Sequence, residues 1–117
     1  MNKESDIYHI PVKPMSINEA WKGRRFKTDK YKAYVIAVKA KLPVIKLPPT
    51  PYKVSFWFGF STSLSDVDNP TKPTLDILCQ KYNFSDRHVM ELTLKKVMVK
   101  KGSEFFSFKI EHYNEQS

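Results

Sequence analysis

The stretch "YKVSFWFGFSTSLSDVDNPTKPTLDIL", residues 52–78, joins a strand pattern to a helix pattern through an acidic segment. In residues 52–60 every second side chain is apolar, which predicts a central β-strand. In residues 75–82 apolar side chains recur at helical spacing, which predicts a helix. Since proline is tolerated only in the first turn of a helix, Pro70 and Pro73 place the start of this helix between them.

The sequence before residue 52 indicates one more strand and one more helix. Residues 7–12 alternate between apolar and polar side chains, as a first strand does. Residues 13–28 have no clean period and predict a long loop. From residue 29 to residue 42 apolar side chains recur at three- and four-residue steps, which predicts an amphipathic helix with Thr28 as its N-cap.

The segment after the unit predicts a turn and then two strands, over 89–99 and 105–113. The apolar alternation changes phase at Lys95–Lys96, which indicates a β-bulge there. Residues 100–104 predict a hairpin turn. The predicted order is therefore β-α-β-α-β-β, an α+β fold with a small mixed β-sheet and two main helices.

The composition indicates a folded, basic protein. The chain has 117 residues, of which 41% are hydrophobic and 14% aromatic. This length and composition predict a single folded domain, 1–117. The net charge of +8 points to a polyanionic partner, with nucleic acid first and an anionic membrane surface second. A merely basic soluble protein is the alternative.

Location and redox chemistry are constrained by what the sequence lacks. No stretch of about 18 apolar residues is present, so we expect no membrane-spanning segment. The first ten residues lack the apolar core of a signal peptide. The single cysteine, Cys79, excludes an internal disulfide and a cysteine-cluster zinc site. A cytoplasmic location is therefore expected.

Negative charge is concentrated in one part of this basic chain. Five of the twelve acidic residues lie within residues 66–91. Asp66 and Asp68 follow a strand two positions apart, so in an extended segment their side chains point to the same side. Lys72 and Asp76 are four positions apart on the predicted helix and share one of its faces. The strand end and the helix start therefore predict a small acidic pocket that contains one ammonium group.

Asp86, in the turn after the helix, could return to the same end of the sheet and join this pocket. Neighbouring carboxylates repel each other, and a shared proton or a cation relieves the repulsion. Oxygen ligands without histidine or cysteine select Mg²⁺ or Mn²⁺, which suits chemistry on a phosphodiester with Lys72 neutralising charge in the transition state. Two simpler interpretations stay open. Asp68 or Asn69 could cap the helix, and Lys72 with Asp76 could be an ordinary surface pair.

The basic residues predict two surfaces for phosphate contacts. Residues 21–32, "WKGRRFKTDKYK", hold six basic and three aromatic side chains with one acid, which suits phosphate contacts and base stacking. Lys95, Lys96, Lys100 and Lys101 form a second candidate patch. For any single residue a solvated face is the alternative. The residues predicted to bind DNA are Lys22, Arg24, Arg25, Lys27, Lys30, Lys95 and Lys96.

The segment "DVDNPTKPTLDIL", followed by "FSDRHV" and a lysine-rich strand, resembles the RusA family of Holliday junction resolvases. Upstream, "PMSINEAW", an arginine pair and a helix with two tyrosines follow in matching order. The resemblance covers nearly the whole chain and implies a RusA-like fold. It implies that Asp66, Asp68 and Asp86 bind the metal, that Lys72 is catalytic together with them, and that Asp76 is the helix aspartate of the family.

The resemblance also implies an activity. Members are homodimeric endodeoxyribonucleases that use Mg²⁺, with Mn²⁺ as a possible substitute, to cut opposing strands of a four-way DNA junction symmetrically in recombination and repair. They are typical of phage and prophage genomes, which implies a bacterial or phage-infected cytoplasm. Asn69 and Asp76 would support the ligands from outside. One position departs from the family: Ser85 stands where a second aspartate usually precedes Asp86, which leaves the site one negative charge short.

Two other functions are compatible with the sequence. One is a module that binds branched or single-stranded DNA without cutting it. The other is a nuclease for flaps or replication forks.

Overall fold

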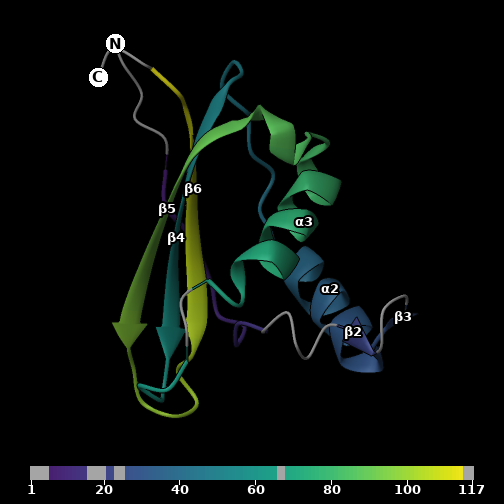
Figure 1. The fold of residues 1–117 in the computed structure, drawn as a ribbon, viewed down its shortest axis with the longest axis vertical. Helices are drawn as coiled ribbons and strands as arrows, with labels where there is room; N and C mark the ends of the chain where they lie inside the picture. Colours follow the sequence, from purple (N-terminus) through teal and green to yellow (C-terminus); the bar gives the residue numbers. More distant parts are fainter. Residues whose placement is uncertain (1–5, 16–20, 23–25, 66–67, 115–117) are drawn as a thin grey trace.

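The computed structural model describes residues 6–15, 21–22, 26–65 and 68–114, of which 21–22 and 26–27 are described by their backbone alone. These residues form a four-stranded sheet, and the two helices lie together on one of its faces (Figure 1). The main elements follow in the predicted order of strand, helix, strand, helix, strand, strand. The predicted α+β class is therefore confirmed.

β4 (Tyr52–Phe60) lies in the interior of the sheet, as its continuous apolar face predicts. The strand order is β1-β6-β4-β5, with β1 at Tyr8–Ile10, β5 at Val89–Met98 and β6 at Phe105–His112. β4 pairs antiparallel with β6 and parallel with β5, and β1 pairs antiparallel with β6. The sheet is therefore mixed, as predicted, and β5 forms one of its edges.

The turn after β5 does not close a hairpin between paired strands, so that prediction is wrong. β5 and β6 lie on opposite sides of β4, and the connection between them crosses the end of β4. There the N–H of Val99 donates to the carbonyl of Phe60 at 2.8 Å. Gly102 turns the chain with a φ of 96°, a conformation that glycine adopts without steric cost.

The β-bulge predicted at Lys95–Lys96 is also wrong. Pairing with β4 is regular at both lysines, and the register shifts only at the start of the strand, between Tyr52 and Lys53 of β4. The apolar pattern changes phase for a different reason. β5 is an edge strand, and apolar side chains such as Met90 and Met98 are 61% and 54% exposed, so burial does not enforce a strict alternation.

α2 (Asp29–Lys41) begins where the sequence predicts it. The side-chain oxygen of Thr28 accepts a hydrogen bond from the N–H of Tyr31 at 3.1 Å, which confirms Thr28 as the N-cap. Before α2, residues 13–28 are not all loop. They contain a short ribbon of β2 (Trp21–Lys22) and β3 (Phe26–Lys27), whose two-residue strands are too short to produce a recognisable alternation.

α3 (Thr71–Tyr82) packs beside α2 on the sheet (Figure 1). It starts between Pro70 and Pro73, as predicted. A buried hydrogen bond of 2.9 Å joins Tyr34 Oη of α2 to Thr74 Oγ1 of α3. Burial of the phenol raises the pKa of Tyr34 to about 12, so the hydroxyl stays protonated and the contact stays neutral.

The core lies between the sheet and the two helices. It is built mainly from the helix-facing side chains of β4 and β6, on which apolar side chains of both helices pack. Phe106, Phe108 and Ile110 of β6 are buried in this core. Among the described residues no helix is both long enough and apolar enough to cross a membrane.

Candidate active site

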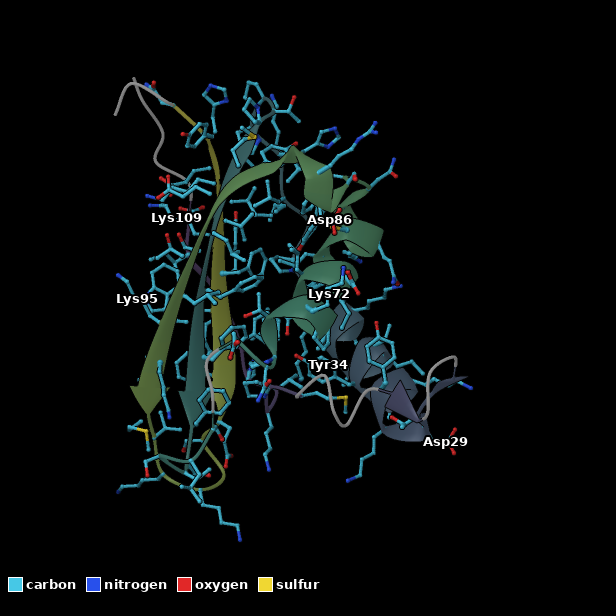
Figure 2. All side chains as sticks on the ribbon, in the orientation of Figure 1. Asp29, Tyr34, Lys72, Asp86, Lys95 and Lys109 are labelled. Atoms are coloured by element: carbon cyan, nitrogen blue, oxygen red, sulfur yellow. The ribbon has the colours of Figure 1, made fainter. Side chains whose placement is uncertain are left out.

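Lys72 brings together two carboxylates that lie on different elements. Its ammonium is 3.2 Å from Asp76 Oδ1, one helical turn further along α3, and 3.4 Å from Asp86 Oδ2, which is 14 positions away in the sequence. Figure 2 shows Lys72 and Asp86 close together at α3, and both side chains are about half exposed. The predicted meeting of Lys72, Asp76 and Asp86 is therefore observed.

Asp86 is held by a capped turn. Asp86 is the first residue of η1, a 3₁₀ turn over Asp86–His88. Before this turn, α3 ends at Asn83, which has a left-handed backbone with a φ of 57°. Ser85 caps this turn: its Oγ accepts the N–H of Arg87 at 3.3 Å, while its own N–H donates to His88 Nδ1 at 3.4 Å. A hydroxyl at position 85 therefore fixes the backbone that presents Asp86.

The two carboxylates keep Lys72 charged. The hydrogen bond and charge of Asp76 are the main causes that raise the pKa of Lys72. Burial opposes them, and the hydrogen bond and charge of Asp86 add smaller increases in this pKa. The ammonium therefore stays protonated far above neutral pH. Lys72 can act as a fixed positive charge or as a hydrogen-bond donor, and it is unsuited to accept a proton at pH 7.

Asp68 and Asn69 lie just before α3, but they do not cap it. The N-cap position is Pro70 and receives no side-chain hydrogen bond, so the helix-cap interpretation of either residue is wrong. The backbone carbonyl of Asp68 accepts the N–H of Thr71 at 3.2 Å, which leaves the exposed carboxylate for other partners. Asn69 lines a cavity of about 220 Å³ together with the loop that follows β4. Asp66, the other predicted ligand, lies outside the described residues.

The chemistry of the donor set fits a hard divalent cation, although the described part of the site is incomplete. Asp76 and Asp86 offer carboxylate oxygens and already share one positive group, the ammonium of Lys72. Oxygen donors of this kind suit Mg²⁺ and Mn²⁺. Among the described residues, however, no three histidine, cysteine, aspartate or glutamate side chains lie close enough together to hold a metal ion. The described carboxylates, Asp68 included, therefore do not form a metal site by themselves.

Two residues that were not predicted as site residues, Cys79 and Tyr31, are affected by the charges of the carboxylates. Cys79 is half-buried, and its pKa rises to about 11 because of burial first and of the charges of Asp86 and Asp76 next. Tyr31 of α2 is buried, and the charge of Asp76 adds to the effect of burial in raising its pKa. The spacing of Cys79, three positions after Asp76 on a helix, is a signal that could have placed it beside the site.

The structure separates the two lysines that the sequence combined into one basic patch. Lys95 lies on the sheet face that carries no described helix, with its ammonium 5.5 Å from the ring centroid of Trp57. Figure 2 shows Lys95 and Lys109 on this side, away from Lys72 and Asp86. Lys96, the next residue of the same strand, points to the opposite face, where its ammonium is 5.8 Å from the ring centroid of Phe60.

The first basic surface is described only in part. Lys30 is exposed in the first turn of α2. Figure 2 places the neighbouring Asp29 at the far end of the helix layer from Asp86. The side chains of Lys22 and Lys27, and the predicted DNA contacts Arg24 and Arg25, lie outside the described residues.

No family model matches the chain, and no curated protein matches it.

Proposed function

We propose that this protein is an Mg²⁺-dependent, structure-selective endodeoxyribonuclease that acts as a homodimer on Holliday junctions, the four-way junctions of DNA recombination and repair. The observation that carries the proposal is the contact of Lys72 with both Asp76 and Asp86. A lysine in the first turn of a helix and an aspartate after its end meet at one place, as the resemblance to the RusA family requires. An ordinary surface pair would need only Asp76.

Each described residue has a definite task in this proposal. Asp86, presented by the capped turn, would hold the metal together with Asp66 and Asp68. Mg²⁺, when bound there, supplies the Lewis-acid charge for phosphodiester hydrolysis. Lys72 donates a charge-assisted hydrogen bond to the phosphate or to the leaving oxygen, and its raised pKa keeps it able to do so at neutral pH.

Asp76 is proposed to position Lys72 rather than to bind the metal. A lysine side chain has many rotamers, and a partner one turn away on the same helix restricts them. Because Asp76 is the main cause of the raised pKa of Lys72, it also protects the charge of the ammonium. The net charge of +8 per chain, or 2 × 8 = +16 for the proposed dimer, attracts the polyanionic substrate towards this acidic site.

A second candidate is a protein that binds branched DNA without cutting it. One observation favours it: the described carboxylates do not form a group of three around a common point. Ser85 also leaves the segment before Asp86 with one negative charge fewer than the family pattern has.

A cleavage assay separates the two candidates. The full chain would be incubated with a labelled synthetic four-way junction in Mg²⁺, in Mn²⁺, in Ca²⁺ and in EDTA, with linear duplex, flap and fork DNA of matching sequence as controls. We expect paired symmetric cuts in the junction in Mg²⁺ and none in EDTA. Asp68→Asn should bind the junction in Ca²⁺ and leave it uncut in Mg²⁺.

Three other outcomes would change the conclusion. If the wild-type chain and Asp68→Asn both bind the junction and neither cuts it in Mg²⁺ or Mn²⁺, the non-cleaving module is correct. If flaps or forks are cut in preference to four-way junctions, the nuclease stands with a different substrate. If no branched DNA is bound more tightly than linear duplex, both candidates are wrong.

A further inference from the structure

We infer that Lys96 is a positioning residue for the segment that begins at Asp66. Its ammonium binds the loop 61–65, which leads from β4 to the predicted metal ligands. The role in metal binding rests on the proposed nuclease function, whereas the attachment of the loop does not. The sequence assigned Lys96 to DNA binding. Its observed contacts are with other residues of the same chain and indicate a structural role instead.

The ammonium of Lys96 is bound to backbone carbonyls of one loop. It donates to the carbonyl of Ser63 at 2.8 Å and to that of Ser65 at 2.5 Å, and it lies over the ring of Phe60. Two of its three N–H groups are therefore used by the chain itself. Ser65 directly precedes Asp66 in the sequence, so the contact fixes the backbone at the point where the acidic segment begins.

The position of Lys96 in the sheet makes these contacts possible. β5 runs parallel to β4 as its neighbour, and Lys96 pairs in register with Phe58 near the carboxyl end of β4. A loop that leaves this end can therefore fold over the adjacent strand. Ligand sites of sheets with parallel strands commonly lie beyond the carboxyl ends of those strands.

The same loop is attached on its other side to the connection between β5 and β6. Ser61 Oγ donates to Glu104 Oε2 at 2.6 Å, and Glu104 Oε1 accepts the N–H of Gly102 at 2.9 Å. One cationic and one anionic side chain thus hold residues 61–65 from both sides. Such a loop needs external attachment, because Ser61–Leu64 are exposed and offer few buried contacts.

Lys95 provides a matched control for the charge of Lys96. Both are exposed lysines on the same strand, and their substitution changes the net charge equally. Lys95 points to the opposite sheet face and lies over Trp57. We would compare Lys96→Met, Lys95→Met and Lys96→Arg with the wild type. Methionine keeps most of the apolar stem and removes the donors, and arginine restores charge and donors.

The experiment measures the loop and the metal dependence separately. Amide hydrogen exchange of residues 61–65 in the free protein should become about 10-fold faster in Lys96→Met and should be unchanged in Lys95→Met. The Mg²⁺ concentration for half-maximal junction cleavage should rise by about 10-fold in Lys96→Met, because the loop directly before the predicted ligand Asp66 loses its attachment. Junction affinity in Ca²⁺ should stay within about twofold of the wild type. Lys96→Arg should recover both properties.

The outcomes distinguish the inference from the proposed function. Equal effects of Lys96→Met and Lys95→Met on exchange and on Mg²⁺ dependence would overturn the inference. So would a loss of junction affinity in Lys96→Met with unchanged Mg²⁺ dependence, which would make Lys96 a phosphate contact. If the wild type cuts nothing, the proposed function has failed. The attachment of the loop by Lys96 is then supported by faster exchange in Lys96→Met alone and overturned by unchanged exchange.

Discussion

The strongest test of the acidic site compares Asp86→Asn with Asp76→Asn. Both carboxylates contact the same ammonium at similar distances, 3.4 Å and 3.2 Å. If their only task were to hold Lys72, the two substitutions should impair the protein alike. The proposed site predicts different defects, because Asp86 would bind the metal and Asp76 would only position Lys72.

The structure sets the expected effect on stability. The side chains of Lys72, Asp76 and Asp86 are 56%, 34% and 53% exposed, so solvent screens both ion pairs. Pairs of this kind contribute about 0.2–1 kcal/mol each. For a domain of this size, such a loss lowers the melting temperature by at most about 5 °C. Both variants should therefore remain folded at 25 °C, and their losses of stability should agree within about 1 kcal/mol.

The expected effect on cleavage is larger and differs in kind. Asp86→Asn should abolish cleavage at Mg²⁺ concentrations that saturate the wild type, a loss of about 100-fold or more. Asp76→Asn should lower the maximal rate by about 10-fold at an unchanged Mg²⁺ requirement. Single-turnover cleavage of a four-way junction over a Mg²⁺ titration measures both quantities, and circular dichroism melts measure stability.

Glu111→Gln is the control, because it removes one negative charge from β6, where Glu111 pairs with Lys109. It should leave cleavage unchanged. The reasoning would be refuted if Asp86→Asn and Asp76→Asn had the same Mg²⁺ dependence. It would also be refuted if Asp86→Asn unfolded the protein at 25 °C, because the contact would then be structural.

Three further predictions concern Tyr34, Cys79 and Gly59. Tyr34→Phe removes the buried hydroxyl that bonds to Thr74 and should lower the free energy of unfolding in urea by about 1–2 kcal/mol; an unchanged midpoint would show that the bond contributes nothing. Since burial raises the pKa of Cys79 to about 11, its thiol should react with a disulfide reagent at pH 8 roughly 100-fold more slowly than in the urea-unfolded chain, and equal rates would contradict this. Gly59→Ala places a methyl group 2.3 Å from the ring of Phe105 and should cost about 1–3 kcal/mol in the same urea assay, a loss that Phe105→Ala should relieve if the clash is its cause.

The parts of the fold that the sequence predicts well are those in which burial enforces a period. β4 and α2 place apolar side chains in the core at regular steps, so their alternation and their helical spacing are clear in the sequence. β5 lies at the sheet edge, where exposed apolar side chains broke the alternation and suggested a bulge that is absent. The placement of β6 beside β4 could not be predicted, because strand order depends on packing between distant segments.

Some contacts of the candidate site could likewise be predicted from the sequence, and others could not. The pairing of Lys72 with Asp76 followed from helical spacing, and the approach of Asp86 followed from a short connection after the helix. The different roles of Lys95 and Lys96 could also have been deduced, since adjacent residues of a strand point to opposite faces. The contacts of Lys96 with Ser63 and Ser65 could not, because they depend on how a loop folds over a strand 31 to 33 positions away.

The contacts of Ser85 concern the one position at which the chain departs from the RusA pattern that it resembles. The cap of η1 requires a short side chain that accepts a backbone N–H, and both serine and aspartate meet this requirement. Serine therefore keeps the geometry of Asp86 and removes only a charge. With serine at position 85, no second carboxylate there competes with Asp86 for the ammonium of Lys72. The proposed metal also loses part of the electrostatic attraction that would let it displace the ammonium. Under the proposed function, the competition between Lys72 and a divalent cation for Asp86 would therefore decide between the cleaving and the non-cleaving candidate.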